Sequence, residues 1–150
     1  MEYRKPEESK LICLLDSGEL VQAVQLAEEE LKNNPDYLSY YGHAQAIWRT
    51  EVQECGSKQN AADSILEKAI EDFAVSISLN RCFAPAHLLY ASLLAIKSQR
   101  MLKEKYIEES KKHLTKAINH FQKAEEINPE YAGIILPQLR ETKKLLASLQ

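Results

Sequence analysis

Histidine is the residue type in this chain best suited to metal binding or acid–base catalysis, and the sequence holds four of them. They are His43, His87, His113 and His120. None lies at the spacing of a zinc or catalytic motif: Glu109 and His113 are four residues apart, but a His-Glu-x-x-His pattern is absent. We therefore interpret Glu109 and His113 as a solvent-facing pair, and we expect no metal site.

The cysteines could form disulfides, bind zinc or act as nucleophiles. They are Cys13, Cys55 and Cys82, an odd set on separate segments without Cys-x-x-Cys spacing. This pattern favours neither a disulfide framework nor a zinc site, and it predicts a cytoplasmic or other reducing intracellular compartment. Cys82 lies at a helix junction, where a helix N-terminus could activate a thiol, but we favour a small residue buried between two repeats.

Motifs for nucleotide and hydrolase chemistry are missing as well. There is no glycine-rich phosphate loop and no Gly-x-Ser-x-Gly elbow, and the chain has only four glycines. The formal net charge is -3 and the pI about 5.8, so no global positive field attracts a phosphate backbone. We expect neither an enzyme nor a cofactor, and no nucleic-acid partner.

The elements that would position any site are expected to be long helices in a soluble chain. Apolar residues make up 45% of the 150 residues and charged residues 27%, while glycine and proline are few. The N-terminus lacks the apolar run of a signal peptide. The longest mostly apolar stretch, 84–96, contains Pro85 and His87 and is shorter than the roughly 20 residues that span a bilayer.

Three stretches of the chain repeat one pattern of residues. Each has a reference position preceded by asparagine and followed, two residues later, by an aromatic residue; the reference positions are Pro35, Arg81 and Pro129. Twelve residues before them stand Ala23, Ala69 and Ala117; fifteen before, Leu20, Leu66 and Leu114; eight before, Ala27, Phe73 and Phe121. Any three amphipathic helices would share apolar columns, but they would not share these junctions.

The repeated residue types have a physical interpretation. A small alanine lets two crossing helices approach closely. Asparagine tolerates the left-handed conformation that often ends a helix, and a following proline cannot continue one. We therefore expect a close helix crossing at the alanine of each repeat and a helix stop at its asparagine.

The third unit resembles the tetratricopeptide repeat, since Ala117, Phe121, Ala124 and Pro129 stand at the spacing of that family's second-helix signature. The other two units match it partly. The reference positions are 46 and 48 residues apart, however, whereas tetratricopeptide repeats span about 34 residues. The resemblance therefore implies lengthened helices. Armadillo and HEAT units have a closer period, but their signatures match less well.

The resemblance implies an all-α fold in which antiparallel helix pairs form a right-handed superhelix. We expect seven helices, at about 6–16, 19–33, 36–54, 58–79, 84–99, 104–127 and 131–149. They form one repeat domain over 1–150, with units at about 6–35, 36–81 and 84–129 and a capping helix at about 131–149. We place a turn at 98–104 by analogy with Gly56, and expect Pro137 to kink the last helix or delay its start to about residue 136.

The resemblance also implies a function, because the first helix of each pair lines a concave groove that commonly holds a peptide or a partner helix. On this chain the groove residues would be Tyr40, His43, Ala46, Arg49, Leu88, Leu89, Ser92 and Ile96. We expect a non-enzymatic scaffold that binds a protein or peptide partner there. Two alternatives stay open: the same apolar surface pairs two copies as a homodimer, or lengthened helices or the capping helix cover it.

Overall fold

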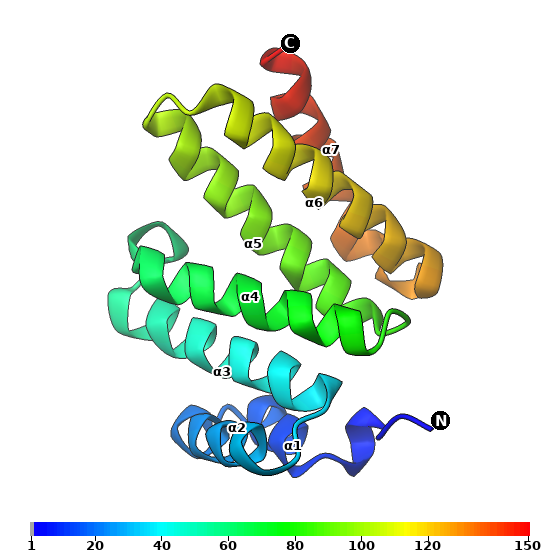
Figure 1. The fold of residues 1–150 in the computed structure, drawn as a ribbon. Coiled ribbons are helices and arrows are strands. Elements are labelled where there is room, and N and C mark those ends of the chain that lie inside the picture. The colour runs from blue at the N-terminus through cyan, green and yellow to red at the C-terminus, as the bar shows by residue number, and fades with distance from the viewer. Residues whose placement is uncertain (1) are drawn as a thin grey trace. The chain divides into compact units, whose positions relative to one another are not determined.

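The computed structural model describes residues 2–150. These residues form seven α-helices and three short 3₁₀ helices, and they contain no strand (Figure 1). The α-helices are α1 (Lys10–Asp16), α2 (Leu20–Asn33), α3 (Tyr37–Cys55), α4 (Asp63–Leu79), α5 (Ala84–Lys103), α6 (Ile107–Ile127) and α7 (Ala132–Ser148). The 3₁₀ helices are Pro6–Glu8, Lys58–Asn60 and Pro129–Tyr131. The predicted all-α class and the number of helices are confirmed.

The helices form two compact units, Met1–Arg81 with α1 to α4 and Cys82–Gln150 with α5 to α7. The boundary falls at Arg81, the second reference position of the sequence repeat. Whether both units belong to one repeat domain stays a prediction.

In the first unit, α1, α2 and α3 enclose a core of small and aliphatic side chains. Its fully or almost fully buried members are Leu11, Leu15, Ala23, Ala27 and Ala46. Gly42 on α3 permits the closest approach, because a Cβ atom there would lie 2.3 Å from Leu11 Cδ2. Helix α4 lies antiparallel beside α3 (Figure 1).

Local signals set the ends of α3. The Asp36 side chain accepts hydrogen bonds from the backbone N–H groups of Leu38 and Ser39, and the Ser39 hydroxyl accepts from the Asp36 N–H. This reciprocal cap starts the helix. The helix ends at Cys55 because Gly56 adopts the left-handed conformation, with φ of 82°.

In the second unit, α5 and α6 form a hairpin of two long antiparallel helices, and α7 packs on it (Figure 1). The predicted turn at 98–104 is wrong, because α5 continues to Lys103. Ser98 is instead buried, and its carbonyl accepts a 3.0 Å hydrogen bond from the Ser110 hydroxyl of α6. The chain reverses at Lys105, a non-glycine residue with φ of 68°. Neither glycine nor proline marks this turn in the sequence.

Helix α7 accommodates Pro137 in its interior. The predicted delay of its start to about residue 136 is wrong, since α7 begins at Ala132, directly after the 3₁₀ turn Pro129–Tyr131. Proline lacks the N–H that would bond to the carbonyl four residues earlier, so the helix gives up one hydrogen bond there.

The repeated alanines are alike in burial: Ala23, Ala69 and Ala117 are each 0% exposed, on α2, α4 and α6. The repeated asparagines also end these helices alike. Asn34, Asn80 and Asn128 have φ of -149°, -148° and -136°, and each N–H bonds to the carbonyl four residues earlier. The helices stop at the three asparagines, as expected, but none of the three adopts the left-handed conformation: Asn80 and Asn128 have extended backbone, and Asn34 has ψ of 73°.

Candidate functional site

The first-unit part of the predicted groove is largely committed to internal packing. Ala46 is fully buried in the core with α1 and α2, and His43 is buried at 7% exposure. His43 Nδ1 lies 2.6 Å from Asp72 Oδ2 on α4. Arg49 is half-buried and donates to the Leu15 carbonyl at 2.8 Å. Tyr40 is half-buried as well, so Tyr40 and Arg49 are the members of this set with accessible surface.

The second-unit part of the predicted groove lies on α5, where Leu88, Leu89, Ser92 and Ile96 are all half-buried. The Ser92 hydroxyl donates to Gln138 Oε1 of α7 at 2.8 Å, and the Gln138 amide donates to the Ile134 carbonyl at 3.2 Å. Helix α7, the capping helix, thus contacts the second-unit part of the predicted groove at Ser92. Whether this set binds a partner stays a prediction.

Beyond Ser92, the second unit contains a groove of about 330 Å³ bounded by three helices. Its lining residues are Ala95 and Gln99 of α5, Leu114 of α6, and Glu141, Thr142, Lys144, Leu145 and Ser148 of α7. Leu114 is fully buried and forms the floor, while Glu141 and Lys144 are exposed. The groove therefore combines an apolar interior with a rim of both charge signs.

Two sets of residues on helix α7 position it along the groove. Ile135, Leu139 and Thr142 are buried and hold the helix on the second unit. The stripe Gln138, Glu141, Leu145 and Ser148 follows at helical spacing and carries the contact to Ser92 and the groove lining. The sequence predicted a capping helix at about 131–149, but none of its residues was predicted to line the groove.

No family model matches the chain, and neither does any curated protein or solved structure. The resemblance to tetratricopeptide repeats therefore stays an expectation from the sequence.

The buried His43–Asp72 pair is the chemical feature that sequence reasoning missed. Asp72 is 2% exposed although it is charged, and Lys68 Nζ lies 3.4 Å from its other oxygen. The signal was in the sequence: position 72 lies between Ala69, Phe73 and Ser76 on the apolar face of α4. A charge on such a face requires a partner, and His43 provides it.

His87 and His120 form a second imidazole pair, which joins α5 to α6. Their Nδ1 atoms lie 2.9 Å apart and the rings stack with centroids at 5.1 Å. The Tyr90 and His120 rings meet edge to face, with their centroids 4.8 Å apart. Burial, followed by the nearby His87 and Lys116, lowers the pKa of His120 to about 4. The described residues contain no group of three histidine, cysteine or acidic side chains arranged to hold a metal ion.

The pKa of His120 predicts that acid destabilises the chain. The folded state disfavours the proton, so the stability contribution is present above pH 6.5, the ordinary histidine value, and is lost as the pH falls toward 4. Because the ring is only partly buried, we expect a loss of about 1–2 kcal/mol. Urea unfolding at several pH values checks this: His120→Gln should flatten the dependence of the unfolding free energy on pH. An unchanged pH dependence in His120→Gln would contradict the assignment.

The cysteines are all free thiols. Cys82 is exposed, so its expected burial between two repeats is wrong. Cys55 lies 3.3 Å from a Glu51 carboxylate oxygen, and this hydrogen bond raises the pKa of the Cys55 thiol. A raised pKa disfavours the reactive thiolate. Among residues 2–150, no helix is long and apolar enough to cross a membrane.

Proposed function

We propose that this chain is a non-enzymatic scaffold of the tetratricopeptide type, whose antiparallel helix pairs stack as a right-handed superhelix and hold a peptide or helix of a partner protein. The equivalent burial of Ala23, Ala69 and Ala117 supports the repeat. The helix ends at the three asparagines, whose φ lies between -149° and -136°, support it as well. The observation that carries the binding function is the open groove between α5, α6 and α7.

The groove suits an apolar anchor residue on a partner helix or peptide. Its volume of about 330 Å³ is small, and its interior is formed by Ala95, Leu114 and Leu145. Burial of an aliphatic or aromatic anchor would contribute about 1.5–3 kcal/mol. Glu141 and Lys144 on the rim would orient a partner that carries charges of both signs around the anchor.

Replacing Leu145 with aspartate should weaken partner binding at least about tenfold, because it places a charge in the apolar interior of the groove. The measurement is affinity capture from an extract of the source organism, followed by titration of the purified prey with wild type and variant. Ala147→Asp is the matched control, since it adds the same charge at an exposed position of α7. Leu89→Asp tests the second-unit part of the predicted groove, on α5, in the same way.

Two further results decide the groove. Gln99→Trp, at an exposed lining position, adds bulk without burying a charge and should also block binding if Leu145→Asp unfolds the chain. Equal binding by wild type, Leu145→Asp and Gln99→Trp would exclude this groove as the binding site.

The alternative function is a self-assembling subunit, and exposed apolar side chains on α7 favour it. Ile134 is 56% exposed and Leu136 is 43% exposed. Such side chains would mark an interaction surface if they belong to one contiguous apolar patch. Light scattering across a dilution series separates the two functions: a dimer that persists on dilution and is lost in Ile134→Lys would assign α7 to self-assembly.

A further inference from the structure

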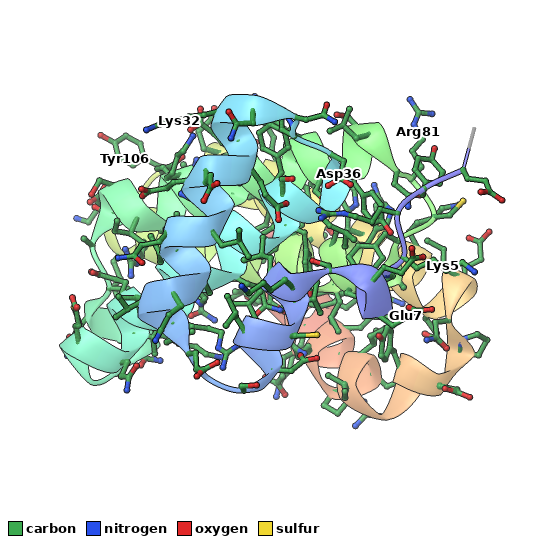
Figure 2. The ribbon with its side chains drawn as sticks, turned by 90° about the horizontal axis from the view of Figure 1, so that it is seen from below. Lys5, Glu7, Lys32, Asp36, Arg81 and Tyr106 are labelled. Atoms are coloured by element: carbon green, nitrogen blue, oxygen red, sulfur yellow. The ribbon has the colours of Figure 1, made fainter. Side chains whose placement is uncertain are left out.

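The N-terminal segment, residues 2–5, binds to the first unit as an extended peptide. It precedes the 3₁₀ turn Pro6–Glu8, and Lys5 has extended backbone with φ of -88° and ψ of 146°. The Arg4 guanidinium donates to both oxygens of Asp36, at 2.8 and 2.9 Å, and to Glu30 Oε1 at 2.9 Å. Figure 2 shows the segment with Lys5 passing on the side of the molecule where Asp36 lies. Such two-pronged pairing is specific for arginine over lysine.

The residues around the Arg4 guanidinium also contact the backbone of Arg4 and the aromatic residue before it. The Tyr37 hydroxyl donates to the Arg4 carbonyl. The Tyr3 and Tyr37 rings meet edge to face, with centroids 5.6 Å apart and planes at 78°. Three features of a ligand are thus contacted together: an arginine, its own carbonyl and the aromatic residue before it.

The receptor side is held in place by contacts that do not involve Arg4. Asp36 Oδ1 is fixed by the N–H groups of Leu38 and Ser39, both at 3.0 Å. The Ser39 hydroxyl, fully buried, donates to Glu30 Oε1 at 2.8 Å. Both carboxylates are thus held by groups other than Arg4, which is the preorganisation that a binding site needs.

The N-terminal segment itself, by contrast, has little burial apart from the contacts of Tyr3 and Arg4. Tyr3 is 51% exposed, and Glu2 and Lys5 are exposed as well. A segment with little burial and no regular secondary structure opens locally at low free-energy cost. A hollow of about 220 Å³ adjoins Arg4 and is lined by Leu26, Glu29, Glu30, Asn33 and Asn34. A further acidic residue, Glu29, therefore lies close to the Arg4 site.

We propose that Glu30, Asp36 and Tyr37 form an arginine-recognition notch that the N-terminal segment closes as a detachable strap. When the strap leaves, an extended segment of a partner protein that carries an aromatic residue followed by arginine takes its place. The notch is in the first unit and the groove is in the second, so the two proposals fail or succeed separately.

The test uses the full chain and a fluorescent peptide with the sequence of residues 2–8 as the probe. Arg4→Ala in the protein removes the strap's anchor and should let the peptide bind about ten- to a hundredfold more tightly than wild type, whose own strap competes for the notch. Lys5→Ala is the matched control: it removes the same charge one residue later, leaves Arg4 paired and should bind the peptide as wild type does. Fluorescence anisotropy measures each affinity.

Two changes test the chemistry of the notch. Asp36→Asn added to Arg4→Ala should abolish peptide binding, and a peptide with lysine in place of arginine should bind more weakly. Equal peptide affinity for wild type and Arg4→Ala, or no binding to either, would overturn the proposal. A wild-type dimer that grows with concentration and is lost in Arg4→Ala would assign the notch to a second copy's strap and would overturn the partner version.

Discussion

Replacing His43 with leucine should lower the free energy of unfolding of the chain by about 3–5 kcal/mol. His43 is the close partner of the Asp72 carboxylate, which is 2% exposed and lies 2.6 Å from the imidazole. Without the imidazole, this carboxylate remains in the core with only the Lys68 ammonium, 3.4 Å from its other oxygen, as a partner, and the Lys68 side chain is 53% exposed. Urea unfolding followed by the fluorescence of Trp48, the only tryptophan and a residue of α3, measures the loss.

The same pair supplies its own controls. Asp72→Asn in the His43→Leu chain should recover much of the lost stability, because an uncharged amide costs less to bury than a carboxylate. Lys68→Ala should cost less than about 1 kcal/mol, as expected of a pair with one solvated partner. A His43→Leu chain as stable as wild type would show that the pair contributes nothing to folding.

Replacing Phe121 with alanine should cost about 3–5 kcal/mol, and Phe73→Ala should cost a similar amount. These side chains are 0% and 1% exposed and occupy the same column of the repeat, on α6 and α4. The loss combines the transfer of an aromatic ring to water with the cavity that it leaves. Circular dichroism in urea measures Phe121→Ala, and Trp48 fluorescence measures Phe73→Ala.

Tyr106→Ala is the matched control for the aromatic column, because this side chain is 58% exposed and its removal should change the stability by less than about 0.5 kcal/mol. A large cost at Phe121 with almost none at Phe73 would contradict the equivalence of the two positions.

The helical elements could be predicted because local signals and the apolar period agree over most of the chain. The columns of Ala23, Ala69 and Ala117 were assigned to close packing from residue type alone, and all three are fully buried. Asp36 and Gly56 mark the ends of α3 by capping chemistry that sequence displays directly.

The features that could not be predicted depend on partners distant in the chain. The chain reverses at Lys105, whose backbone is in the left-handed conformation, and lysine as a residue type does not favour this conformation. Ser98 is buried within α5, and its carbonyl accepts a hydrogen bond from Ser110 of another helix. Asp72 could have been noticed as a charge on an apolar face, but its partner His43 lies 29 residues away.

The candidate sites follow the same division. The sequence drew attention to the apolar residues of α5, whereas the groove in the second unit also needs Glu141, Lys144 and Leu145 of α7. The arginine notch joins residues 4, 30 and 36, a combination that no local motif announces. Both sites arise where helices with different roles meet, which periodicity within one helix does not reveal.

Site-specific photocrosslinking shows whether the groove between α5, α6 and α7 holds a partner protein. A photoreactive amino acid is placed at Leu145 inside the groove or, as the control, at Ala147 on the exposed side of α7. The proposed function predicts a discrete adduct with one partner protein from position 145 and none from position 147. Identical adducts from both positions, or an adduct only with a second copy of this chain, would contradict it.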